Sequence, residues 1–430
     1  MRYEKLSASL YQKNRSSFVE HMSDGGLALF CSNDIYPTSA DGHMPFKQAS
    51  DIFYLTGVDQ EESVLLLFPQ ASQPQYREVL FLKETSETIA IWEGAKLTKA
   101  EATAQTGIKT IFWTSDFERV LRLLLAEAVC VYLNNNEHTR AVIEVETREE
   151  RFNKWFRNHY ANYRIERSAP IMHAIRAVKS AEEVKQTQRA IDITHQALLR
   201  VMKWMKPGVM EFEVEAEFAH EFLRNGSRGF AYTPIIASGA SACVLHYISN
   251  DQACKDGDLL LMDVGAEYGN YNADMTRCIP VNGRFSPRQK DVYNAVLRVM
   301  KEARKILVPG VWMHEYHKAV GECMTKELVD LKLITMDDVK NQNPEWPAYK
   351  RYFMHGTSHF LGLDVHDVGH WKNKTEIGNL FTIEPGIYIR EEGIGVRIEN
   401  NIVLTPQGND DLFQAFPIEV EEIEEIMNAH

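Results

Sequence analysis

Two stretches of the chain follow the same order of sequence patterns. An amphipathic segment from 180 to 206 ends in Pro207-Gly208-Val209, and a later amphipathic segment ends in Pro309-Gly310-Val311. Each is followed by another helical pattern and then by a short apolar run with one carboxylate two residues before a glycine: Asp263 in the first stretch, Glu384 in the second. The sequence therefore predicts two copies of one helix–helix–strand unit, related by a pseudo-twofold axis.

Each stretch also supplies a second carboxylate further along the chain. Asp274 follows the turn-rich segment 267–272, which can return the chain as the second strand of a hairpin, and Glu399 ends the segment 395–399. Asp263 lies in an apolar run, where an ionised carboxylate is costly unless a cation or several donors compensate it. We therefore expect the four carboxylates to face one another at the centre of the repeat.

Taken singly, these carboxylates have ordinary structural explanations. Asp263 would cap a turn, and Asp274 would form a salt bridge with Arg277. Glu399 shares one strand face with Arg397 and would form an ion pair with it. Four carboxylates in matched contexts are harder to explain in this way, so a cation site competes with the structural interpretation.

Histidines are dense between the carboxylates of the first copy and those of the second. His355, His359 and His366 lie within residues 355–369, where glycines and β-branched residues favour strand and loop over a continuous helix. A single histidine is more often a satisfied polar residue than a ligand, and the HExxH zinc pattern is absent here. Together with four carboxylates, however, one imidazole completes an oxygen-rich site suited to Mn, Co, Fe or Zn ions. Two such ions can activate a shared water for amide hydrolysis without a serine or cysteine nucleophile.

The length of the chain sets the expected number of domains. At 430 residues it is too long for one compact core, which predicts two domains, 1–172 and 173–430. The first alternates helical patterns with short apolar runs typical of buried strands, carries no metal-binding cluster, and is interpreted as a mixed α/β scaffold or oligomerisation domain. In the second, Ser180 and Glu183 form a capping box at the start of the first helix. The predicted strands of the first domain cover 26–31, 64–68 and 79–82.

Composition and charge exclude several classes of function. The net charge of -13 argues against nucleic acid or an anionic membrane as a partner, and residues 419–426 are interpreted as an acidic terminal helix. We find no apolar run of the roughly 18 residues that a membrane span needs and no signal-peptide pattern at the start. Six cysteines without CxxC spacing are expected to be reduced, buried thiols. These features predict a cytoplasmic protein.

The ordered set Asp-x10-Asp, His, Glu-Pro-Gly and Arg-x-Glu resembles the pita-bread metallopeptidases, which include methionine aminopeptidase, aminopeptidase P and prolidase. The resemblance covers about residues 173–405 and implies a pita-bread α+β catalytic domain that binds two divalent ions. Asp263 would bind one ion, and Asp274 and Glu399 would bridge both. His359 and Glu384 would bind the other ion. For both ions, manganese is favoured over Co, Zn or Fe.

Residues around these ligands resemble the proline-specific branch of that family. His246, His355 and His366 match its additional active-site histidines, and Tyr232, Tyr388 and Arg397 match positions that line its substrate pocket. Residues 46–57 look like the N-terminal domain of aminopeptidase P. Trp92 matches a tryptophan that reaches the substrate cleft in bacterial members, although a core or interface role is an equal alternative.

The resemblance implies an enzyme that releases the N-terminal residue from peptides with proline at the second position. It also implies a homodimer or homotetramer assembled through the N-terminal domain. The nearest alternative is a prolidase, which cuts only Xaa-Pro dipeptides. A non-catalytic peptide-binding module is disfavoured, because such modules commonly lose metal ligands and all five are retained here.

Overall fold

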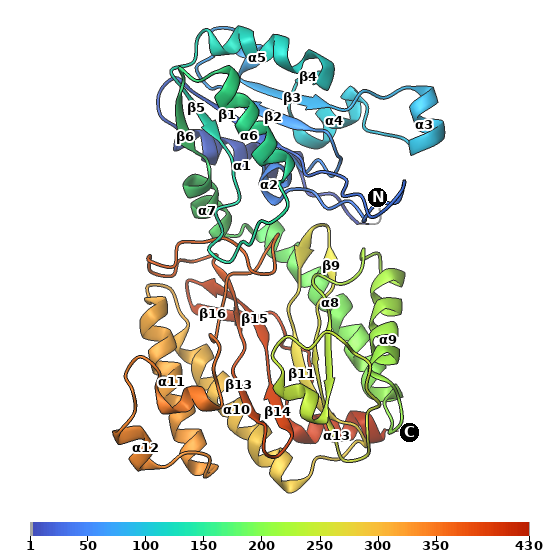
Figure 1. Cartoon of the computed structure of the whole chain (residues 1–430), viewed down its shortest axis with the longest axis vertical. Coiled ribbons are helices and arrows are strands. Elements are labelled where there is room, and N and C mark those ends of the chain that lie inside the picture. Colours follow the sequence, from blue (N-terminus) through green and yellow to red (C-terminus); the bar gives the residue numbers. More distant parts are fainter. Residues whose placement is uncertain (1–2, 430) are drawn as a thin grey trace. The chain divides into compact units, whose positions relative to one another are not determined.

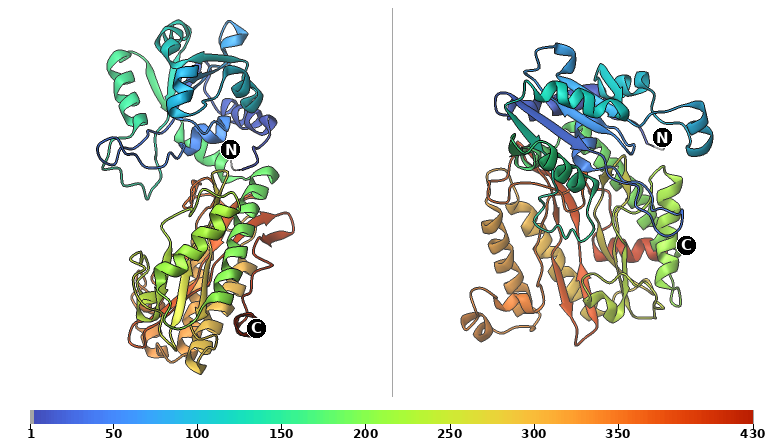
Figure 2. Two further views of the ribbon diagram at one scale, coloured as in Figure 1. Left: turned by 90° about the vertical axis from the view of Figure 1, so that its right-hand side faces the viewer. Right: turned by 45° about the horizontal axis from the view of Figure 1, so that its top comes forward.

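The computed structural model describes residues 3–429 of the chain. These residues form two compact units (Figures 1 and 2). One unit is Lys5–Arg176, and the other runs from Ala177 onward and includes the described residues up to Glu4. Within the described residues, no helix is long and apolar enough to cross a membrane.

The unit Lys5–Arg176 is a mixed α/β structure built on one sheet with the strand order β4-β3-β2-β1-β5-β6. The central strand β1 pairs antiparallel with β2 and parallel with β5. Leu27 and Leu29 face a core shared with α5 and α6, whereas Phe30 meets Phe18 of α1 with ring centroids 5.1 Å apart. The strands are β1 Gly26–Cys31, β2 Val64–Leu67, β3 Glu78–Leu82, β4 Thr110–Trp113, β5 Cys130–Leu133 and β6 Arg164–Arg167, which confirms the three predicted ones. The helices are α1 Ala8–Glu20, α2 Ser50–Thr56, α3 Glu87–Glu93, α4 Lys99–Thr106, α5 Phe117–Leu125, α6 Arg148–His159 and α7 Ala169–Ala177.

The other unit contains the predicted repeat. Ser180 and Glu183 form the expected capping box at the start of the first helix, which ends at Trp204, two residues before the predicted end. In Figure 1 the strands of both copies lie in the middle of the unit, with α9 on one side and α11 on the other. The first copy consists of α8 Ala181–Trp204, α9 Glu211–Arg224, β7 Ile235–Ser238, β8 Leu259–Asp263, β9 Glu267–Tyr268, β10 Tyr271–Asn272 and β11 Thr276–Pro280. The second consists of α10 Pro287–Ile306, α11 Met313–Asp330, β12 Leu380–Ile383, β13 Gly386–Ile389, β14 Ile394–Arg397, β15 Asn400–Thr405 and β16 Gly408–Asp411, and the helices α12 Met336–Lys340 and α13 Val420–Asn428 lie outside the repeat.

Both copies place their carboxylates at the same positions of a strand pair. In each copy an outgoing strand pairs antiparallel with a return strand, β8 with β11 and β12 with β15, and a short two-stranded ribbon lies between them in the chain. Asp263 ends β8 and Glu384 directly follows β12. Asp274 and Glu399 come just before the return strands β11 and β15. The antiparallel strand pair predicted for Asp263 and Asp274 is therefore confirmed. The short ribbon β9–β10, which lies between the two strands in the chain, was not predicted.

The two copies join at these return strands. Asp274 N–H donates to Asn401 Oδ1 (3.1 Å), and Asn401 Nδ2 donates to the Asp274 carbonyl (2.7 Å). Glu399 N–H donates to the Thr276 carbonyl (3.1 Å). Backbone and amide hydrogen bonds thus fix both second carboxylates in the seam between the copies.

Arg277 strengthens the same seam. Its buried guanidinium donates to the carbonyls of Thr276 (2.9 Å) and Glu399 (2.8 Å) and to Asn400 Oδ1 (2.7 Å). The possible salt bridge between Asp274 and Arg277 is therefore wrong, because this guanidinium is used to hold the backbone of the second copy.

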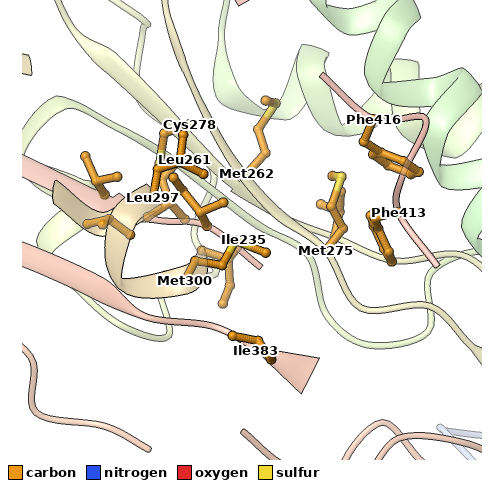
Figure 3. Close-up of a cluster of buried hydrophobic side chains, with 14 of the residues drawn as sticks. Ile235, Leu261, Met262, Met275, Cys278, Leu297, Met300, Ile383, Phe413 and Phe416 are labelled. Atoms are coloured by element: carbon orange, nitrogen blue, oxygen red, sulfur yellow. The ribbon is translucent and has the colours of Figure 1, made fainter. Parts of the chain in front are cut away.

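One hydrophobic core runs through both copies. Figure 3 shows part of it, with Leu261 and Met262 of β8 and Leu297 and Met300 of α10 in the same cluster as Ile383 of β12. Because the strands that end in Asp263 and Ile383 are anchored in this core, the carboxylates at their ends are held by rigid elements rather than by free loops.

The glycine after Asp263 allows a close approach of two backbone segments. A Cβ atom on Gly265 would overlap the carbonyl oxygen of Ala273. We expect Gly265→Ala to lower the free energy of unfolding by about 1–3 kcal/mol or more, measured by urea denaturation. Gly208→Ala serves as a comparison, since a Cβ there meets no atom within 4 Å and only the backbone angle φ of +92° is strained. Equal losses in the two variants would contradict this steric explanation.

Candidate metal centre

The structure brings the five predicted ligands together. Asp274, His359 and Glu399 are buried and offer donor atoms that all lie within 4.8 Å of one another. His359 Nε2 lies 3.4 Å from Asp274 Oδ2 and 3.6 Å from Glu384 Oε1. Residues from both copies of the repeat therefore contribute to one cluster.

Asp263 joins this cluster through Tyr232. The Tyr232 hydroxyl lies 2.7 Å from Asp263 Oδ1 and 2.6 Å from Asp274 Oδ1. A phenol carries one proton, so two contacts this short require a further proton on one of the carboxyl groups. Burial, followed by the charge of Asp263, raises the pKa of Asp274, in agreement with that requirement.

The orientation of His359 favours metal binding. Its Nδ1 lies 2.9 Å from the carbonyl oxygen of Phe360, to which an N–H at this position donates. This hydrogen bond leaves Nε2, the nitrogen nearest to Asp274 and Glu384, as the free ligand atom. Burial lowers the pKa of His359, but the hydrogen bond with Asp274 and the charge of Glu384 outweigh burial and raise it overall.

The electrostatics of the cluster show that its carboxylates need additional positive charge. Burial raises the pKa of Glu384 to about 7, with Asp274 adding to the shift. Burial and the charge of Asp274 raise the pKa of Glu399 well above its usual value. Divalent cations would stabilise the ionised forms, and the donor set of carboxylates with one imidazole fits Mn, Co, Fe or Zn. The residues present therefore fit a pair of divalent metal ions.

Arg397 pairs with Asp263 rather than with Glu399. Its Nη2 lies 2.5 Å from Asp263 Oδ2, and its Nε donates to Thr276 Oγ1 (3.1 Å). The hydroxyl of Thr276 in turn donates to Glu399 Oε2 (2.7 Å). Arg397 and Glu399 both contact the side chain of Thr276, as expected for residues on a common face. They do not lie on the same strand, because β14 ends at Arg397.

A chain of hydrogen bonds leads from Arg397 through Tyr388 to His355. Arg397 Nη1 donates to the Tyr388 hydroxyl (2.8 Å), which lies 2.8 Å from His355 Nε2. His355 Nδ1 lies 2.8 Å from the carbonyl of Gly356 and 3.7 Å from Glu384 Oε2. Burial, then the charge of Arg397, lowers the pKa of His355 to about 4, so this imidazole is neutral near pH 7.

The two remaining histidines approach the cluster from loops. His366 packs against His359 with ring centroids 4.4 Å apart and ring planes at 82°. His246 is exposed, in the loop after the 3-10 helix Gly239–Cys243, and its charge contributes to lowering the pKa of His355.

Trp92 belongs to the other unit of the chain. It lies on the short helix α3 with 84% of its surface exposed. The core alternative for Trp92 is therefore wrong, and the indole is available to contact another molecule.

Sequence reasoning missed Thr276 and Asn401. Thr276 links Arg397 to Glu399, and Asn401 holds the backbone of Asp274. Both lie near the predicted ligands in the chain, at Thr276-Arg277 and Glu399-Asn400-Asn401, but local spacing does not indicate their partners. Their partners lie 121 to 127 residues away in the chain, so only the folded repeat reveals them.

Comparison with known proteins identifies the family. Residues 185–406 match the pattern of metallopeptidase family M24, and residues 11–132 match the aminopeptidase P N-terminal domain. The chain is 36% identical to the Xaa-Pro aminopeptidase of Escherichia coli over 99% of both chains. A putative aminopeptidase P from Bacillus anthracis superposes with a TM-score of 0.91 at 33% identity over 98% of both chains.

Aminopeptidase P from E. coli with the inhibitor Pro-Leu superposes with a TM-score of 0.88 at 34% identity over 99% of both chains. These likenesses extend over both units and include the mixed α/β and pita-bread folds predicted for them. The chain therefore belongs to metallopeptidase family M24, as a metalloexopeptidase of the aminopeptidase P type.

Proposed function

We propose that the chain is a dinuclear metal-dependent aminopeptidase that releases the N-terminal residue from peptides with proline at the second position. The observation that carries this proposal is the buried cluster of Asp274, His359 and Glu399, joined by Asp263 and Glu384. The Xaa-Pro aminopeptidase relatives support the choice of substrate.

We assign the metal-ligand roles as follows. Asp263 would hold one ion, His359 and Glu384 would hold the other, and Asp274 and Glu399 would serve both. When bound, two divalent cations would acidify a shared water and polarise the peptide carbonyl. We favour manganese, because hard carboxylate oxygens dominate the donor set.

Around these ligands, other residues would move protons and stabilise charge. Glu384, whose Oε1 lies 3.6 Å from His359 Nε2 in the cluster, is suited to take a proton from the attacking water and pass it to the leaving group. The proline nitrogen needs that proton as the C–N bond breaks, because a neutral amine is expelled far more readily than its anion. His246 and His366 would stabilise the charge that develops on the carbonyl oxygen.

Tyr232, Tyr388 and the neutral His355 are proposed to shape the substrate pocket. Arg397 fixes the Tyr388 hydroxyl and Asp263 at the same time, and so would align the pocket with the first metal ligand. We also propose that the exposed Trp92 contacts substrate or a second copy of the chain, in a homodimer or homotetramer. A cytoplasmic location agrees with six free cysteines, because reducing compartments keep thiols unpaired.

Substrate length separates this proposal from the prolidase alternative, which the aminopeptidase relatives disfavour. We expect the manganese-loaded protein to release the first residue from Xaa-Pro tripeptides and longer peptides, measured by amino-acid release. Peptides with alanine in place of proline serve as the matched control and should be cleaved at least about tenfold more slowly. Cleavage of Xaa-Pro dipeptides alone would show a prolidase instead, and no cleavage of any Xaa-Pro peptide would contradict both.

The ligand assignment predicts different effects for two substitutions in the cluster. Asp274→Ala should remove a bridging ligand, lower the metal content and reduce kcat/KM by about a thousandfold or more. His366→Ala should keep the metal content and lower kcat by about a hundredfold. Metal analysis and steady-state kinetics on both variants test this, and metal loss in His366→Ala would make His366 a ligand.

The raised pKa values predict how metal removal changes stability with pH. In the metal-free protein Asp274, Glu384 and Glu399 hold protons that the unfolded chain has already released, so folding binds protons. Stability should therefore fall as pH rises from near 4.5, the ordinary value of Glu384, to its folded value of about 7. The raised pKa of His359 acts in the same direction.

We expect the Tm of the chelator-treated protein to fall by about 5 °C or more between pH 5 and pH 7.5. The manganese-loaded protein should show a clearly smaller fall in scanning calorimetry, because the ions replace the protons. Parallel curves for the two forms would show that the cluster does not bind the ions.

A further inference from the structure

A buried ion pair lies beside the loop that carries His366. Lys179 Nζ lies 2.7 Å from Asp367 Oδ2, and the side chains are only 3% and 1% exposed. Lys179 comes just before the capping residue of α8, so the pair joins the start of the catalytic unit to a segment 188 residues further along the chain. Burying two charges adds little stability over an apolar pair, because desolvation offsets their attraction. The pair is therefore better explained by the geometry it fixes than by the stability it adds.

The loop held by this pair begins and ends at the metal centre. Asp367 N–H donates to the carbonyl of Phe360 (2.9 Å), which closes the loop 360–367. His359 directly precedes Phe360 and His366 directly precedes Asp367, and the ring centroids of the two histidines are 4.4 Å apart. A shift of Asp367 would therefore move the imidazole next to it relative to a metal ligand.

Tight packing around the pair fixes the loop further. A Cβ atom on Gly362 would overlap Asp367 Oδ2 and lie 2.7 Å from Lys179 Cε. From the opposite copy of the repeat, Asn272 Nδ2 donates to the carbonyls of Gly362 and Leu363, both at 2.9 Å. The loop is thus held by an ion pair on one side and by an amide on the other.

We propose that Lys179 and Asp367 are positioning residues that hold His366 against His359 and thereby set the rate of the chemical step. They act through His366 and bind neither metal nor substrate. This inference rests on the proposed function, because the rate in question is that of Xaa-Pro hydrolysis.

The first experiment compares Lys179→Met with the wild type, both loaded with manganese. We expect kcat on an Xaa-Pro tripeptide to fall by about 10- to 100-fold, with KM within about threefold and an unchanged metal content. Lys179→Arg keeps the charge and should recover part of kcat. Gly362→Ala keeps both charges but displaces the carboxylate, and should lower kcat in the same way.

Arg15→Met provides the control. It breaks another ion pair with a fully buried cation, in which Arg15 of α1 contacts Glu78 of β3 at 3.0 and 3.1 Å in the other unit. It should lower the Tm without changing kcat. If Lys179→Met also lowers only the Tm, the pair is purely structural and the inference is wrong.

Two further measurements keep the test decisive. Should the single variant fold poorly, the double variant Lys179→Met, Asp367→Leu removes both buried charges and should fold while kcat stays low. Hydrogen exchange of residues 360–367 in the metal-free protein reads the loop without any activity, and should be faster in Lys179→Met than in the wild type. Unchanged hydrogen exchange in Lys179→Met overturns the inference, whatever the activity of the wild type. A wild type that cleaves no Xaa-Pro peptide overturns the proposed function instead.

Discussion

Mutual repulsion among buried carboxylates is the constraint on which the catalytic unit depends. Asp263, Asp274, Glu384 and Glu399 converge at the seam between the copies, where water screens the buried Asp274 and Glu399 poorly. A single chain segment would not hold these four carboxylates together, because their negative charges repel one another. The fold solves this by placing them at the ends of strands anchored in a common core, so that the free energy of burial of many apolar side chains opposes the repulsion.

The neutral residues of the seam matter as much as the charged ones. Across the junction of the two copies, the Thr276 hydroxyl donates to the Glu399 carboxylate and the Asn401 amide donates to the Asp274 carbonyl. The Arg277 guanidinium donates to the Glu399 carbonyl. None of these contacts needs a metal ion. Contacts between protein groups therefore position the residues of the cluster, which would limit the reorganisation that metal binding requires.

Sequence patterns predicted what is local or periodic. The capping box at Ser180 and the strand Gly26–Cys31 follow from patterns within a few residues, and the paired carboxylates follow from the likeness of two stretches of the chain. The choice of partners did not follow, because it depends on contacts between distant segments. Arg397 selects Asp263 over the nearer Glu399, and Lys179 meets Asp367 across 188 residues. Neither choice leaves a local signal in the chain.

The division of the ligands between two copies of the repeat has a consequence for biosynthesis. Thr276 and Glu399 meet across 123 residues, and the second pair of carboxylates, Glu384 and Glu399, is synthesised after the first. A partly synthesised or truncated chain holds only the first pair of carboxylates. The complete set of ligands therefore forms only after both copies have been synthesised and have packed against each other.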